Sequence, residues 1–142
     1  MDTVLKRLIL TPEQVEEILN HARAEAPNEA CGLLGGRGER VKKVYPLPNV
    51  ERSPARYRAD PEAQYRAMME IEERGWEIVG IYHSHPASPA YPSPTDLELA
   101  FYPEALYLII SLAEGNQPIL RAFRLEEGKA EEVEVQIPAL EE

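Results

Sequence analysis

The stretch WEIVGIYHSHPASPAYPSPTD, residues 76–96, decides the fold because it joins a strand to a group of polar side chains. Its first seven residues form an apolar run of strand length, typical of a central strand buried on both faces. The run leads directly into His83 and His85, two of the chain's three histidines. Four prolines follow, with Ser93 and Asp96 three residues apart. Two interpretations arise: a stiff loop before a helix cap, or a metal site.

The composition limits the classes of protein to consider. With 142 residues, we expect a single domain spanning 1–142. A net charge of −10 argues against nucleic acid and anionic membranes as partners. The longest apolar run, 105–113, is too short to span a bilayer, and the N-terminus lacks a signal-peptide pattern. A single cysteine excludes an intrachain disulfide framework. Together these features predict a cytoplasmic protein.

Helical and strand patterns alternate along the chain, which predicts an α/β fold. Apolar spacing and capping residues predict helices over 11–26, 60–75 and 93–101. In the second helix we expect Tyr65, Met68, Met69 and Glu72 to share a face. Apolar runs predict strands over 30–34, 40–47, 76–82, 105–112, 119–125 and 132–137.

Three further expectations concern the segments between and beside these strands. The glycines of 35–38 predict a hairpin turn between the first two strands. Residues 46–60, rich in proline and charge, are expected to form an exposed loop. The alternation of Val133, Val135 and Ile137 with polar residues predicts a half-exposed edge strand.

The two histidines have the spacing of ligands on a strand. Residues i and i+2 of a strand point to the same side, so His83 and His85 can present both imidazoles to one point. A zinc ion about 2.0–2.1 Å from each nitrogen fits this spacing, and Asp96 can supply an oxygen ligand. Two histidines and a carboxylate leave one position for water, as in catalytic zinc sites. Zinc lowers the pKa of such a water to about 7.

Each part of this pattern also has a simpler structural explanation. Ser93 and Asp96 have the spacing of a capping box, which is compatible with a ligand role for Asp96. An isolated His-x-His pair is more often a chance pair than a ligand set. The combination at the end of a buried strand favours a metal site. There, the Ser93 hydroxyl could donate to an oxyanion, but the stretch itself contains no general base.

The complete pattern resembles a known family. His83-Ser84-His85, seven residues, Ser93, two residues and Asp96 match the H-[ST]-H-x7-S-x2-D signature of JAMM (MPN+) metallopeptidases. The family also has a glutamate near the end of its first helix, which Glu29 in PNEACGLLGG matches. The resemblance extends from the first helix through the strands after the motif. It implies an MPN fold of cytidine-deaminase-like architecture, in which a curved mixed sheet packs with helices on its faces.

The resemblance also implies roles for five residues. His83, His85 and Asp96 would bind one zinc ion per chain, Glu29 would be the general acid/base, and Ser93 would stabilise the oxyanion. The implied activity is hydrolysis of the peptide or isopeptide bond after the C-terminal Gly-Gly of a ubiquitin-like or sulfur-carrier protein. Water would attack directly, without a covalent acyl-enzyme.

Alternatives to this activity remain open at the level of sequence. One is a non-catalytic MPN-type interaction module. Another is a cysteine hydrolase using Cys31, which would need a nearby histidine and a lowered thiol pKa. Arg52, Arg56 and Arg58 mark the loop 46–60 as a candidate partner-binding surface, although a solvated loop has the same composition. The oligomeric state, a homodimer included, is left undetermined.

Overall fold

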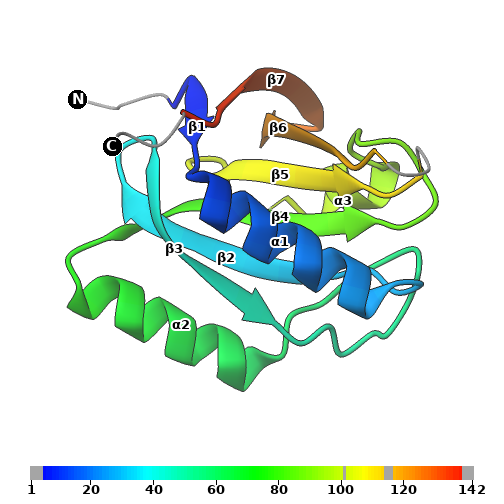
Figure 1. The fold of residues 1–142 in the computed structure, drawn as a ribbon, viewed down its shortest axis with the longest axis horizontal. Helices are drawn as coiled ribbons and strands as arrows, with labels where there is room; N and C mark the ends of the chain where they lie inside the picture. Colours follow the sequence, from blue (N-terminus) through cyan, green and yellow to red (C-terminus); the bar gives the residue numbers. More distant parts are fainter. Residues whose placement is uncertain (1–4, 101, 114–116, 139–142) are drawn as a thin grey trace.

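The computed structural model describes residues 5–100, 102–113 and 117–138, which form seven strands and three helices (Figure 1). In chain order the elements are β1 (Arg7–Ile9), α1 (Pro12–Glu25), β2 (Cys31–Arg37), β3 (Arg40–Leu47), α2 (Pro61–Glu73), β4 (Glu77–His85), α3 (Pro94–Glu98), β5 (Leu106–Ser111), β6 (Ile119–Glu126) and β7 (Lys129–Gln136). None of the helices in these described ranges is long and apolar enough to cross a membrane.

The strands form one curved mixed sheet in the order β1-β3-β2-β4-β5-β6-β7, and β1 also pairs with β7, which closes the sheet into a barrel. β4 and β5 run parallel, as do β1 and its two neighbours, and the remaining pairs are antiparallel. The predicted α/β fold, a curved mixed sheet with helices packed on it, is confirmed. The prediction that 132–137 is an edge strand is wrong, because β7 pairs on both sides.

The error arises because the sequence patterns did not predict β1, the strand that pairs with the outer side of β7. β1 has only three residues, too few for an alternating pattern to be visible in the sequence. Its partners lie far along the chain, since Arg7 pairs with Glu134 and Ile9 pairs with Gln136. The segment becomes a strand because of this distant pairing and not because of a local preference.

Helix α1 begins as the sequence predicts. Thr11 and Gln14 form a reciprocal capping box, in which each side chain accepts a hydrogen bond from the other residue's amide. Helix α1 lies against the sheet (Figure 1). Its Ile18 and Ala22 side chains are fully buried in the core between them. The helix ends before Pro27, which disfavours helical conformation in the residue that precedes it.

The glycines at 35–38 do not all belong to a turn. β2 continues through Gly35 and Gly36 to Arg37, so the predicted turn is placed too early. A side chain at Gly36 would collide with the Arg40 carbonyl, so this glycine permits close strand pairing. Gly38 has a φ of +58° and makes the turn itself.

Helix α2 buries a different face from the one suggested by its large apolar residues. Tyr65 and Met69 are 63% and 39% exposed, whereas Ala67 and Ile71 are buried against the sheet. Ala67 and Ile71 therefore face β2, β3 and β4, and the face that Tyr65, Met68, Met69 and Glu72 share is only partly covered, by the packing of Met68. Helix α3 ends at Glu98, and the predicted end at Phe101 lies outside the described residues.

Alternating side chains divide the interior into two cores. Leu34 and Tyr82 pack on the side covered by α1, whereas Leu33 and Ile81 pack on the side covered by α2. By the same alternation, the odd-numbered residues at the end of β4 face the α2 side. This alternation therefore decides on which side of the sheet each side chain at the polar end of β4 lies.

Candidate metal centre and active site

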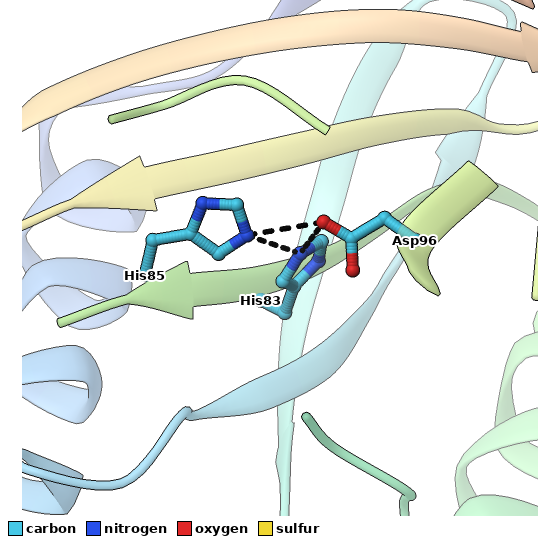
Figure 2. Close-up of side chains that lie close together, drawn as sticks. All are labelled: His83, His85 and Asp96. Atoms are coloured by element: carbon cyan, nitrogen blue, oxygen red, sulfur yellow. Dashed lines mark hydrogen bonds and ion pairs between the residues drawn. The ribbon is translucent and has the colours of Figure 1, made fainter. Parts of the chain in front are cut away.

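Strand β4 carries both predicted histidines inside its regular structure, because the strand extends through His85. His83 and His85 are 1% and 3% exposed, and their rings face each other in the interior (Figure 2). Ser84, between them, points to the opposite side, where its hydroxyl accepts a hydrogen bond from the Ala30 amide at 2.7 Å. The strand alternation thus places the two imidazoles together, as the sequence spacing predicts.

Asp96 reaches the histidines from the first turn of α3. The Ser93 hydroxyl accepts a hydrogen bond from the Asp96 amide at 3.0 Å, and the Asp96 carboxylate accepts one from the Ser93 amide at 2.9 Å. The predicted capping box is present, and it is compatible with a ligand role for Asp96. The capping box fixes the carboxylate in an orientation in which the same Oδ2 atom also faces His83 and His85 (Figure 2).

The three candidate ligand atoms form a compact triangle. The two Nε2 atoms are 3.2 Å apart, and Asp96 Oδ2 lies 3.1 Å from His83 Nε2 and 3.0 Å from His85 Nε2. Ligands about 2.0–2.1 Å from a tetrahedral ion are separated by about 3.3–3.4 Å. The triangle is within a few tenths of an ångström of that spacing, so these residues fit a metal ion.

The surroundings favour a neutral His83 and an ionised Asp96, as metal binding needs, whereas they favour protonation of His85. His85 Nδ1 lies 2.8 Å from the Pro89 carbonyl, which fixes the tautomer with a free Nε2 lone pair. Burial lowers the pKa of His83 and keeps its ring neutral. Burial would raise the pKa of Asp96, but hydrogen bonds to both histidines and to the Ser93 amide hold it below its ordinary range. For His85, burial is outweighed by hydrogen bonds to Asp96 and Pro89, so its pKa is raised.

Glu29 lies on the same side of the sheet as the imidazoles. Cys31 pairs with His83, and the Ser84 amide donates to the Ala30 carbonyl at 3.0 Å, so the register brings Glu29 level with His85. Its side chain is 3% exposed, and Oε1 has no hydrogen-bond partner among the residues that the structure describes. Burial raises the pKa of Glu29 to about 8. His85 lowers this pKa and Asp96 raises it, both by smaller amounts than burial. A carboxyl group with a pKa near neutrality therefore lies close to the three candidate ligands, where perturbed pKa values are typical of functional sites.

Cys31 lacks the features of a nucleophile. Its thiol is 1% exposed and lies 3.7 Å from the Leu47 carbonyl, to which it is positioned to donate. Burial raises the pKa of this thiol to about 12, whereas a catalytic cysteine needs a lowered pKa. The cysteine-hydrolase alternative is therefore not supported, and the residue packs as a small apolar side chain.

Two residues beside the site were missed by the sequence analysis. Tyr57 stacks on His83, and the buried Asn49 side chain donates to the Glu29 carbonyl. Both lie in the segment 46–60, which is therefore only partly an exposed loop. Single polar or aromatic residues in a loop have no periodicity, so the sequence offered no signal for their position.

A cavity of about 380 Å³ adjoins the cluster. Asp96 and Tyr57 line it at the metal centre, and apolar residues of β2 and β4 form much of its wall. Arg56 and Arg58 also line the cavity, whereas Arg52 does not. An open, largely apolar space beside a group of candidate metal ligands is typical of a substrate site.

The fold and the site together define a class of protein, the JAB/MPN metal-dependent hydrolases. The family model for prokaryotic homologs of the JAB domain matches residues 11–126. The chain belongs to this family.

Comparison with individual proteins agrees with this assignment. A "CysO-cysteine peptidase" of Mycobacterium tuberculosis is 37% identical over 132 residues, covering 92% of this chain and 90% of that protein. A Thermus thermophilus protein with the name "Probable TtuB-protein conjugate cleaving protease" is 43% identical over 116 residues, covering 81% of this chain and 74% of that protein. A solved structure from Desulfitobacterium hafniense is 45% identical, with a TM-score of 0.84 and coverage of 94% of both chains. The chain is a JAMM-type hydrolytic enzyme.

Proposed function

We propose that this enzyme hydrolyses the peptide or isopeptide bond after the C-terminal Gly-Gly of a ubiquitin-like or sulfur-carrier protein. The observation that carries the proposal is the gathering of His83, His85 and Asp96, with buried Glu29 on the same face of the sheet. The two relatives named above act, by their names, on a CysO–cysteine bond and on TtuB–protein conjugates. A hydrolase with these relatives needs to recognise a carrier tail and release the amino acid or protein attached to its end.

Zinc is the metal we assign to the site, held by His83, His85 and Asp96, one ion per chain. Two imidazoles and one carboxylate are a donor set that zinc accepts in catalytic sites with an open position. The ion would supply a Lewis acid that polarises the scissile carbonyl and makes a water molecule acidic at neutral pH.

The protein's own groups then move the proton and stabilise charge. Glu29 accepts a proton from the attacking water, and the water oxygen forms a bond to the scissile carbonyl carbon. The Ser93 oxygen already accepts the Asp96 amide proton, so its own hydroxyl proton is available to donate to the oxyanion. The C–N bond breaks as Glu29 returns the proton to the leaving amine. Each proton that is taken up is released, and no bond to the protein forms.

The cavity offers a route for the carrier tail. β1 pairs with β3 only at Ile9 and Arg40, so most of β3 pairs on one side alone, with β2. The apolar cavity leads to Asp96, and its lining carries charges of both signs, with Arg56 and Arg58 beside Glu51, which lies 3.6 Å from Arg58. A tail ending in two glycines has no side chains there, so its backbone can lie close to the cavity wall and reach Asp96.

The proposal is tested with a Gly-Gly-tailed ubiquitin-like protein that carries either a C-terminal cysteine or a lysine-linked peptide. Mass spectrometry should show loss of the group after Gly-Gly with the zinc-loaded enzyme. Glu29→Gln should bind as much zinc as wild type and release no product. A substrate in which Ala-Ala replaces Gly-Gly is the matched control. Equal cleavage of the control would contradict the substrate class, and full activity of Glu29→Gln would contradict the assigned base.

A further inference from the structure

The two candidate metal ligands His83 and His85 are held in orientation by different contacts. His85 has a hydrogen bond between Nδ1 and the Pro89 carbonyl, the kind of contact that fixes the orientation of a metal-binding imidazole. His83 Nδ1 is buried and has no hydrogen-bond partner within residues 5–100, 102–113 and 117–138. The orientation of the His83 ring therefore depends on another contact.

Tyr57 provides that contact. Its ring lies nearly parallel to the His83 imidazole, with centroids 4.7 Å apart and planes inclined by 22°. A ring stacked in this way opposes rotation of the imidazole out of the plane in which Nε2 faces Asp96, 3.1 Å away. Tyr57 comes from the loop between β3 and α2 and not from the strands that carry the ligands.

The loop itself is held by Asn49. This side chain is 7% exposed and satisfies the main chain on both sides of Tyr57. It donates to the carbonyls of Glu29 (3.0 Å) and Arg56 (3.2 Å) and accepts from the amides of Glu51 (3.0 Å) and Arg58 (2.9 Å). The same side chain therefore connects the loop to the main chain of Glu29, so its hydrogen bonds hold both the loop and the candidate acid/base in place.

We propose that Tyr57 is a positioning residue of the metal centre. Its ring holds the His83 imidazole in the orientation for metal binding, in place of the hydrogen bond that His85 has. Asn49 holds the loop so that the ring stays in contact. This inference rests on the proposed role of His83 as a metal ligand.

The alternative role of Tyr57 is purely in substrate binding, since the residue also lines the cavity beside Asp96. The two roles affect different measurements. Loss of a positioning ring weakens metal binding in the absence of any substrate. Loss of a cavity wall raises KM and leaves metal affinity unchanged.

The test compares wild type with Tyr57→Phe, which keeps the ring, and Tyr57→Leu, which removes it. Tyr65→Leu, at a tyrosine that is 63% exposed on α2, is the matched control. Zinc affinity is measured by competition with a chromophoric chelator, and the visible spectrum of the cobalt(II)-loaded protein reports ligand geometry. Circular dichroism of the metal-free proteins checks folding. If Tyr57→Leu does not fold, Tyr57→Met removes the ring and retains an apolar side chain.

We expect Tyr57→Leu to bind zinc about tenfold more weakly and to change the cobalt spectrum. Tyr57→Phe and Tyr65→Leu should stay within about twofold of wild type. Unchanged zinc affinity in Tyr57→Leu, with or without a higher KM, would overturn the inference. An equal loss of zinc affinity in Tyr57→Phe would also overturn it, because that variant keeps the stacked ring. The readout needs no substrate, so failure of the wild type to cleave Gly-Gly conjugates would contradict the proposed function alone.

Discussion

Replacing Glu29 by glutamine should remove a pH-dependent loss of folding stability from the metal-free protein. The side chain is 3% exposed, and burial raises its pKa from 4.5 to about 8. The unfolded chain loses this proton near pH 4.5, whereas the folded chain keeps it until about pH 8. The free energy of unfolding is therefore unaffected by Glu29 below pH 4.5, falls as the pH rises to about 8, and levels off above it.

The structure sets the size of this effect. A pKa rise from 4.5 to about 8 corresponds to at most about 5 kcal/mol of lost stability above pH 8. Local entry of water reduces this value. We expect Glu29→Gln to gain about 2 kcal/mol or more over wild type between pH 5 and pH 9, because the amide has no proton to lose.

The assay is urea denaturation of chelator-treated protein at several pH values from 5 to 9. Glu73→Gln, at an exposed position near the end of α2, is the control and should follow the wild-type curve. Glu29→Gln should diverge from both as the pH rises. A constant difference between Glu29→Gln and wild type across this pH range would refute the reasoning, since it would mean that the Glu29 carboxyl titrates as it does in the unfolded chain.

Four further substitutions test the site and its support. Asp96→Asn should weaken zinc binding at least tenfold, measured by chelator competition, because a charged ligand is lost. Ser93→Ala should lower kcat about a hundredfold in steady-state kinetics while zinc affinity stays within about threefold. Cys31→Ala should keep kcat/KM within about threefold, and chelators should still abolish activity; loss of activity would revive the cysteine mechanism. Gly32→Ala should cost about 3 kcal/mol in urea denaturation, because its methyl group would collide with the Tyr82 ring.

Local sequence signals predicted most of the elements of the fold. The capping boxes of α1 and α3 and the apolar runs of β4 and β5 depend on residues close together in the chain. On α2 the face that Tyr65, Met68 and Met69 share is not the buried one, because the size of an apolar side chain does not by itself identify the buried face. The helix instead approaches the sheet through Ala67 and Ile71. The distance between a helix and the sheet depends on tertiary packing, so local sequence patterns do not predict it.

The gathering of the candidate ligands was also predictable, for a physical reason. The period of two along a strand places His83 and His85 together, and a capping box between residues three positions apart orients Asp96. Glu29 lies 54 residues before His83, so only the family resemblance indicated it. The pairing of β2 with β4 is what brings it level with His85.

The sequence by itself thus determined the strand that carries the histidines, the capped turn that carries Asp96, and the family to which this chain is similar. The tertiary structure decided which residues meet across long separations. It closed the sheet through β1, buried Glu29 and so raised its pKa, and placed Tyr57 on His83. Strand periodicity and helix capping act over a few residues and are visible in the sequence. Burial, register and stacking depend on distant segments and exist only once the chain has folded.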